Sequence, residues 1–235
     1  MRFTVEENVF KTLEDVCFGV VVARGVDNAT KNNEIKDMLE NSIREISEQL
    51  KGENIKEHPK IIPYRNAFGK LGFNPNKFAP SVEALVTRIL KGNQIPNINN
   101  VVDLANSISI KHILPIGAHD IDLVQDDITV RFSATGDSFI PFGASEPELL
   151  ETGELVYASG SNIKTRRWIW RQSEQGKITE RSTNIFFPID GFINDNYGSV
   201  ILARDELALM LQQLFGCEVK VGIIYKNNQG LDLQS

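Results

Sequence analysis

The stretch from Pro80 to Asp122 decides how the middle of the chain folds: PSVEALVTRILKG (80–92), NVVDLANSISI (100–110) and LPIGAHDID (114–122). Apolar residues recur at helical spacing in the first two segments, with Ser81 and 97–100 as N-capping residues, so we predict two short helices. The third segment loses that period and predicts a polar loop. Asn106 is an amide inside an apolar run, and a buried amide needs a hydrogen-bond partner from backbone or ligand.

Helical and strand periods continue on both sides of this stretch. Helical spacing predicts further helices over 31–50, 58–71 and 198–215, each followed by a glycine that suits a helix end. Alternating or continuous apolar runs predict strands over 16–26, 128–133, 153–158, 163–171, 184–189 and 218–225. The polar tail 227–235 is expected to fray. The predicted fold is α/β (mixed α+β): one compact domain, 1–235, with helices concentrated in the N-terminal half around a mixed β-sheet.

Composition narrows the class of protein. The 235 residues are 41% hydrophobic and 24% charged, with a net charge of -6. A nucleic-acid partner would therefore need a local basic patch that acts against the average charge. No apolar run approaches the ~18 residues of a membrane span, and the acidic N-terminus does not resemble a signal peptide. We expect a cytoplasmic protein with no membrane contact, in which Cys17 and Cys217 are reduced core residues.

The segment KTRRWIWR (164–171) combines cations with indoles. As a strand it would alternate, with Lys164, Arg166, Trp168 and Trp170 on one face and Arg171 on the other. These five residues are candidate RNA contacts, because bases and the terminal adenosine of a tRNA stack on such faces. The alternative is that the tryptophans cover a core edge while the arginines pair with carboxylates.

The acidic run at His119, Asp120 and Asp122 could hold magnesium or calcium. No partner motif with metal-ligand spacing accompanies it, and acidic turns are usually solvated or cap helices. We therefore expect no metal and no cofactor. The chain also has no Gly-x-Ser-x-Gly elbow and no phosphate-cradling glycine loop, so nucleophilic catalysis has little support.

Several short sequence motifs occur in a fixed order along the chain: YR (64–65), PSVEAL (80–85), RILKG (88–92), VVDLAN (101–106) and LPIGAHD (114–120). Together they resemble the editing domain, or B-three/four domain, of the bacterial phenylalanyl-tRNA synthetase beta subunit, and especially its free-standing relatives. The resemblance runs from about residue 18 to 215. It implies an α/β fold and metal-free hydrolysis of a mischarged aminoacyl-tRNA ester. In that reaction a pocket holds the amino acid, and water attacks with help from the tRNA.

Two positions depart from the family's pattern. Asn106 matches the pocket asparagine, but Gly117 stands where the family has its editing histidine, and His119 follows two residues later. The pocket glutamate that recognises a tyrosine hydroxyl falls near Pro188, and Asp190 is the nearest carboxylate. The resemblance therefore implies that tyrosine is not the preferred amino acid.

The leading hypothesis is a free-standing deacylase that acts in trans on mischarged tRNA. Its candidate catalytic residues are Asn106, His119 and Asp120. Its candidate substrate-binding residues are Arg65, Gly117 and Asp190, and Arg65 is expected to face the acceptor end with Arg166 and Arg171. A second hypothesis is a non-catalytic module that binds an amino acid, nucleotide or RNA in the same pocket. A third is a metal hydrolase built on 119–122.

Overall fold

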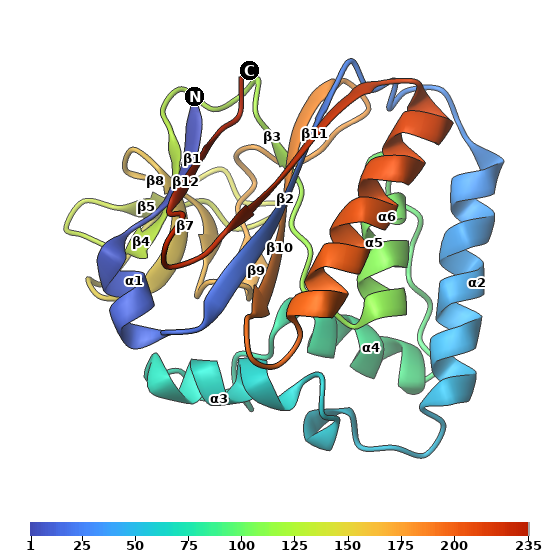
Figure 1. The fold of residues 1–235 in the computed structure, drawn as a ribbon, viewed down its shortest axis with the longest axis horizontal. Coiled ribbons are helices and arrows are strands. Elements are labelled where there is room, and N and C mark those ends of the chain that lie inside the picture. Colours follow the sequence, from blue (N-terminus) through green and yellow to red (C-terminus); the bar gives the residue numbers. More distant parts are fainter. Residues whose placement is uncertain (235) are drawn as a thin grey trace.

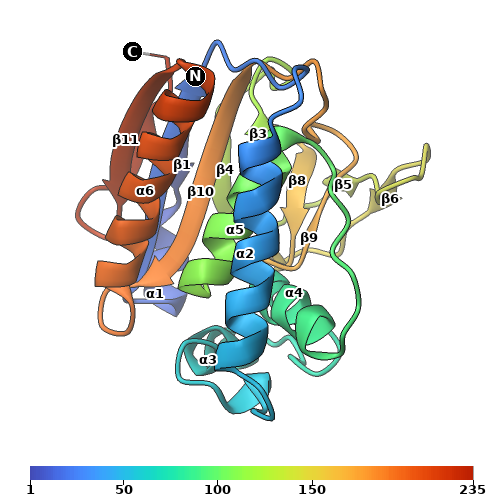
Figure 2. The ribbon, with the colours of Figure 1, turned by 90° about the vertical axis from the view of Figure 1, so that its right-hand side faces the viewer.

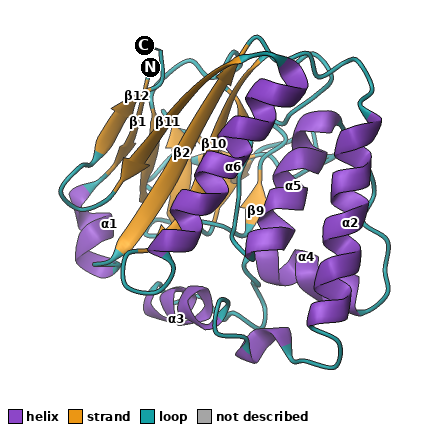
Figure 3. Cartoon of the chain, turned by 45° about the vertical axis from the view of Figure 1, so that its right-hand side comes forward, coloured by secondary structure: helices purple, strands orange, loops and turns teal. Residues whose placement is uncertain are grey.

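Two β-sheets pack face to face, and helices cover the outer face of the smaller sheet (Figures 1 and 3). The computed structural model describes residues 1–234 and contains six α-helices and a short 3-10 helix in that range. The largest hydrophobic cluster draws residues from Phe3 near the start of the chain to Leu233 near its end. The predicted mixed α/β class is confirmed, with the strands divided between two sheets.

The smaller sheet has the strand order β11-β2-β10-β3. Its centre is β2 (Val16–Arg24), which pairs antiparallel with both β10 (Asn184–Phe192) and β11 (Glu218–Ile224). The two-residue strand β3 (His119–Asp120) pairs with β10. A valine-rich run suits β2, because a strand covered on both faces can be apolar at every position.

The larger sheet runs β12-β1-β4-β7-β8-β5-β6, with β9 paired to β8. Its strands are β1 (Arg2–Val5), β4 (Ile128–Phe132), β5 (Ser138–Phe139), β6 (Glu148–Leu149), β7 (Leu155–Ser159), β8 (Asn162–Arg166), β9 (Arg171–Gln172) and β12 (Gly230–Asp232). The prediction of a fraying tail is wrong, because β12 pairs antiparallel with β1. That pairing joins segments from opposite ends of the sequence, so no local sequence pattern predicts it.

Five of the six α-helices precede residue 113, as predicted. They are α1 (Glu7–Thr12), α2 (Asn33–Gln49), α3 (Ile62–Lys70), α4 (Ser81–Leu90) and α5 (Asn100–His112); α6 (Tyr197–Phe215) follows near the end, and the 3-10 helix spans Ile55–Glu57. Helix α6 lies on the smaller sheet, with α5 and then α2 beyond it (Figures 1 and 2). Close packing of α6 needs glycine, since a Cβ on Gly19 would lie 2.9 Å from Val200 Cγ1. Pro80, and not Ser81, occupies the N-cap position of α4.

The predicted strand over 163–171 is wrong beyond Arg166. The chain turns at Arg167 and Trp168, whose φ angles are 48° and 57°, and returns as β9 alongside β8. Positive φ at two successive positions is typical of a type I′ hairpin turn, and it costs a non-glycine residue about 1–2 kcal/mol. Burial of the whole Trp168 indole offsets that cost. The expected alternation of faces therefore does not occur.

Candidate functional site

A cavity of about 80 Å³ lies where the two sheets meet. The loop before β3, strands β7 and β10, the hairpin from β8 to β9 and the first residue of α4 form its walls. The lining residues are Ser81, Pro115, Ile116, Gly117, His119, Tyr157, Thr165, Trp168, Ile169, Trp170, Arg171, Gln172, Pro188 and Asp190. The cavity thus brings together six of the eleven candidate site residues: Gly117, His119, Trp168, Trp170, Arg171 and Asp190.

Asp190 is the acid of this cavity and is 2% exposed. Its Oδ1 accepts hydrogen bonds from the hydroxyl of Tyr157 and from Nε1–H of Trp168, both at 2.6 Å. No group in residues 1–234 donates to Oδ2. Burial raises the pKa of Asp190 to about 7, although the two hydrogen bonds oppose that rise. The carboxyl group is therefore poised to change its charge near neutral pH.

A second hydrogen-bond chain holds the backbone at Asp190. Tyr64 donates from its hydroxyl to the Asp190 carbonyl at 2.8 Å, and Asn196 Nδ2 donates to the Tyr64 hydroxyl at 2.9 Å. Burial raises the pKa of Tyr64 and of Tyr157 well above the usual value, so both phenols remain neutral donors. Helices α3 and α6 thus help to fix the position of the acid.

His119 is buried and neutral at physiological pH. Its ring stacks against Tyr157 and Phe186, with ring centroids 6.0 Å away in each case. Burial, and then the nearby Lys164 charge, lower the pKa of His119 to about 3. Gln172 Nε2 lies 3.5 Å from Nδ1, at the outer limit of a hydrogen bond. That contact favours the tautomer in which Nε2 carries the proton.

Gly117 and Pro188, the two positions that depart from the family's pattern, both line this cavity. A Cβ on Gly117 would lie 3.0 Å from Pro188 Cγ and 3.2 Å from His119 Nε2. The His119 ring therefore lies beside the space into which a side chain at 117 would project. Residues two apart on extended backbone share a face, so the shifts from 117 to 119 and from 188 to 190 keep both polar groups at the cavity.

Trp170 and Arg171 form the rim of the cavity, and further aromatic rings and cations pack beside them. The Arg171 guanidinium lies 4.7 Å from the centre of the Trp170 ring, and Arg167 lies 4.6 Å from the same ring and 4.0 Å from Phe78. Lys77 adds a cation 5.2 Å from Phe78. Arg171 is exposed, and within residues 1–234 it has no carboxylate partner. Trp170 and Arg171 are thus the two members of the predicted RNA-binding set that lie at this rim.

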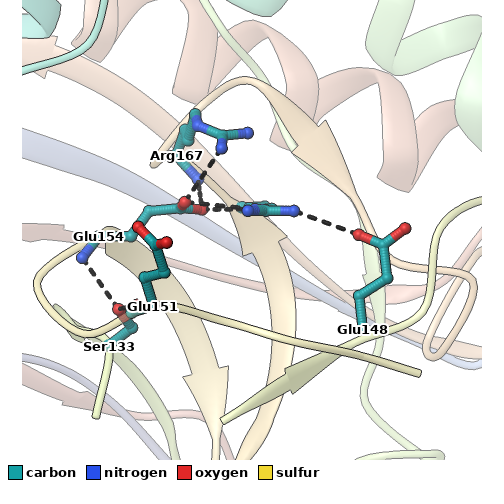
Figure 4. A network of polar contacts seen from close by, with 6 residues as sticks. Ser133, Glu148, Glu151, Glu154 and Arg167 are labelled. Carbon is teal, nitrogen blue, oxygen red and sulfur yellow. Dashed lines mark hydrogen bonds and ion pairs between the residues drawn. The ribbon is translucent and has the colours of Figure 1, made fainter. Parts of the chain in front are cut away.

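Carboxylates hold the other arginines of the hairpin (Figure 4). Arg166 Nε lies 2.9 Å from Glu154 Oε1, and its NH1 group lies 3.3 Å from Glu148. Glu154 also pairs with Arg167 at 3.4 Å and accepts a hydrogen bond from the Arg167 backbone, as Figure 4 shows. The alternative interpretation, in which arginines pair with carboxylates, therefore describes Arg166.

Lys164 and Trp168 are also buried, whereas the predicted strand placed both on an exposed face. Trp168 is completely buried, and Lys164 is 4% exposed. The register between β7 and β8 shifts at Tyr157, which leaves Lys164 as the extra residue of a β-bulge. Burial lowers the pKa of Lys164. Neither side chain is placed to stack on or bind exposed RNA.

Three further candidates lie outside the cavity. Arg65 faces Glu83 at 2.7 Å and Asn76 at 2.7 Å. Asn106 is half-buried on α5, does not line the cavity and has no hydrogen-bond partner in the described part of the chain. Asp120 points to the opposite face of β3 from His119 and accepts a hydrogen bond from Ser182 at 2.5 Å.

The metal interpretation of 119–122 finds no supporting geometry. The Asp122 carboxylate accepts two hydrogen bonds from Asn184 Nδ2 and one from Thr183. Across residues 1–234, no three His, Cys, Asp or Glu side chains converge on a point where a metal ion could bind. The same residues include no helix that is long and apolar enough to cross a bilayer.

Sequence reasoning missed Tyr157, Gln172 and the role of Tyr64. Tyr64 is part of one of the short motifs that resemble the family, and Gln172 directly follows the basic-aromatic segment. The position of each residue in the sequence was therefore a weak indication of a role in the site. Tyr157 gave no such indication, because it sits in an apolar strand and meets Asp190 only through tertiary packing.

The opposed pKa shifts predict how stability depends on pH. Between pH 3.8 and about 7 the unfolded chain releases an Asp190 proton that the folded chain retains, so this group's contribution to stability falls as pH rises. His119 acts oppositely: between pH 6.5 and about 3 the unfolded chain gains a proton that the folded chain excludes, so its contribution falls as pH drops.

The substitution Asp190→Asn removes the pH-dependent contribution of Asp190 to stability and leaves that of His119 in place. Urea unfolding should show the stability of this variant, relative to the natural chain, rising by about 2–3 kcal/mol between pH 5 and pH 8. Asp205→Asn, at an exposed aspartate on α6, is the control for the loss of one negative charge. A constant difference for Asp190→Asn would contradict the assigned pKa of Asp190.

The fold and cavity define a class of protein: a mixed α/β domain with a small buried site that holds one acid and one neutral imidazole. The B3/4 domain family model matches residues 63–200, which is more than half of the chain. The chain belongs to the B3/4 domain family.

Two known proteins are similar to parts of this chain. The phenylalanine-tRNA ligase beta subunit of Fusobacterium nucleatum is 25% identical over 139 residues, which cover 59% of this chain and 15% of that protein. An N-terminal fragment of the phenylalanyl-tRNA synthetase beta subunit from Pyrococcus horikoshii aligns over 92% of this chain and 49% of that one, with 11% identity and a TM-score of 0.47. The chain therefore corresponds to a small part of the curated relative's length.

Proposed function

We propose that this protein hydrolyses mischarged aminoacyl-tRNA in trans, with the cavity as its amino-acid site. The proposal rests on the positions of His119 and Asp190, each two residues after a family position that is changed in this chain. Both side chains still line the cavity, so a histidine and a carboxylate remain at the site. The family relationship to a synthetase beta subunit supports an aminoacyl-tRNA substrate.

The reaction would rest on positioning and polarisation. Water adds to the ester carbonyl carbon, the bond to the ribose oxygen breaks, and that oxygen takes up a proton. His119 Nε2–H would donate to the carbonyl oxygen as negative charge develops there, a role that suits an imidazole kept neutral by burial. Asp190 would hold the amino acid in place, itself fixed by Tyr157 and Trp168.

The cavity volume favours a small amino acid. Its 80 Å³ is well below the roughly 150 Å³ of an apolar cavity that accepts benzene. A tyrosyl side chain would therefore need the walls to move. Pro188, close to the position of the family's tyrosine-recognising glutamate, offers no polar group to a phenol.

A panel of mischarged tRNAs tests the proposal directly. We expect deacylation of a tRNA charged with a small amino acid, no preference for Tyr-tRNA, and the same rate with EDTA present. Inactivity across the panel, together with tight binding of a free small molecule, would support the non-catalytic module instead. Loss of activity in EDTA would indicate a bound metal and contradict the proposed mechanism.

The rim predicts the tRNA contact. Arg171→Ala should weaken tRNA binding and reduce the slope of log affinity against log salt by about 1, because one phosphate contact and its released counterion are lost. The measurement is fluorescence anisotropy at several salt concentrations. Arg44→Ala, at an exposed arginine on α2, is the matched control and should leave the slope unchanged. If both variants behave alike, the tRNA binds another surface.

A further inference from the structure

Asp190 lacks the counter-charge that a buried carboxylate normally needs. No Lys, Arg or His in residues 1–234 forms an ion pair with it, and its raised pKa has burial as the largest cause. An uncompensated buried charge is costly, so proteins usually pair such groups or leave them neutral. Here Oδ1 already receives two donors, whereas Oδ2 receives none and belongs to a residue that lines the cavity.

The groups around Asp190 do not supply that charge. Arg171 also lines the cavity but forms no ion pair or hydrogen bond with Asp190 in residues 1–234. Tyr157 on β7 and Tyr64 on α3 are neutral phenols, and burial raises the pKa of Cys17 on β2 to about 12. His119, which also lines the cavity, is neutral at pH 7.

We propose that the cavity binds a small primary ammonium group, which pairs with Asp190 Oδ2 and takes the place of the missing protein cation. The inference rests on the proposed function for its natural ligand, the α-ammonium of a small aminoacyl group. Binding itself requires no RNA. The cavity volume of about 80 Å³ favours a group about the size of an alanyl or seryl side chain beside the ammonium.

The test uses two ligands that differ at one group. L-Alaninamide carries an ammonium, and L-lactamide has a hydroxyl in its place. The chain has two tryptophans, so its NMR spectrum should contain two indole N–H signals, which Trp170→Phe assigns. Alaninamide should shift the Trp168 signal, because that N–H donates to Asp190, and lactamide should bind at least tenfold more weakly.

The pH dependence has a definite sign. Ammonium binding needs the ionised carboxylate, so affinity for alaninamide should rise roughly 15-fold from pH 5.5 to 7.0, given a pKa of about 7 for Asp190. An α-amino group stays mostly protonated over this range. Affinity that falls as pH rises would show that a protonated Asp190 acts as a donor, and would overturn the proposal.

Variants locate the binding to Asp190. Asp190→Asn keeps an acceptor for Tyr157 and Trp168 but removes the charge, so alaninamide binding should be lost while Asp205→Asn binds normally. Gly117→Ala places a methyl group against the cavity and should also weaken binding, which provides a second test if Asp190→Asn does not fold. Equal binding of the two ligands overturns the inference. Failure of both ligands to bind at roughly 50 mM, a concentration that would detect even a very weak complex, also overturns it. Deacylation of the tRNA panel is measured separately, so either proposal can fail alone.

Discussion

Trp168→Ala should lower the free energy of unfolding by about 4 kcal/mol, among the largest losses expected from one core substitution. The indole is fully buried and packs against Tyr64, Phe68 and Phe192. Its removal leaves a large cavity and takes one of two donors from Asp190. The smaller alanine also retains the positive φ at this position without the burial that offsets it. Urea unfolding at pH 7 measures the loss.

Trp170→Ala is the matched control for this prediction. Trp170 is two residues away and has the same side chain, but it is only half-buried and lies at the rim. Its substitution should cost about 1–2 kcal/mol, because a partly exposed side chain loses less buried surface. Similar losses for the two variants would contradict the assignment of Trp168 to the core and Trp170 to the rim.

Asp190→Asn should reduce the rate of deacylation about 100-fold or more while the protein stays folded. Asparagine can still accept the hydrogen bonds from Tyr157 and Trp168 through its carbonyl oxygen, so the local structure should survive. The variant loses the charge that would orient the aminoacyl group. Single-turnover rates with the preferred mischarged tRNA measure the effect, and circular dichroism confirms the fold.

Asn106→Ala gives the informative comparison. The family resemblance gives this residue a place in the pocket, whereas the structure places it on α5 away from the cavity walls. If the cavity is the site, Asn106→Ala should change the rate less than fivefold, within the ~1 kcal/mol expected of a residue that makes no critical contact. A large loss in Asn106→Ala with none in Asp190→Asn would move the site to α5.

The candidate site was only partly predictable. His119 and Asp190 were identified because each follows a changed family position by two residues, and the period of extended backbone carries that shift onto the same face. Lys164, Arg166 and Trp168 were assigned to an exposed face because alternation was extended through 163–171. The assignment failed at the two left-handed residues, Arg167 and Trp168, since non-glycine residues give no warning of positive φ.

The sequence by itself determined the elements whose pattern is local. Helical spacing and capping located α5, and the continuous apolar run located β2, because side-chain burial repeats with the backbone period. Only the tertiary structure decided the pairing of β1 with β12, the hairpin turn at 167–168 and the meeting of Tyr157 and Trp168 on Asp190. Each of these joins residues far apart in sequence or requires strain, and the energy that fixes them comes from packing of the whole core.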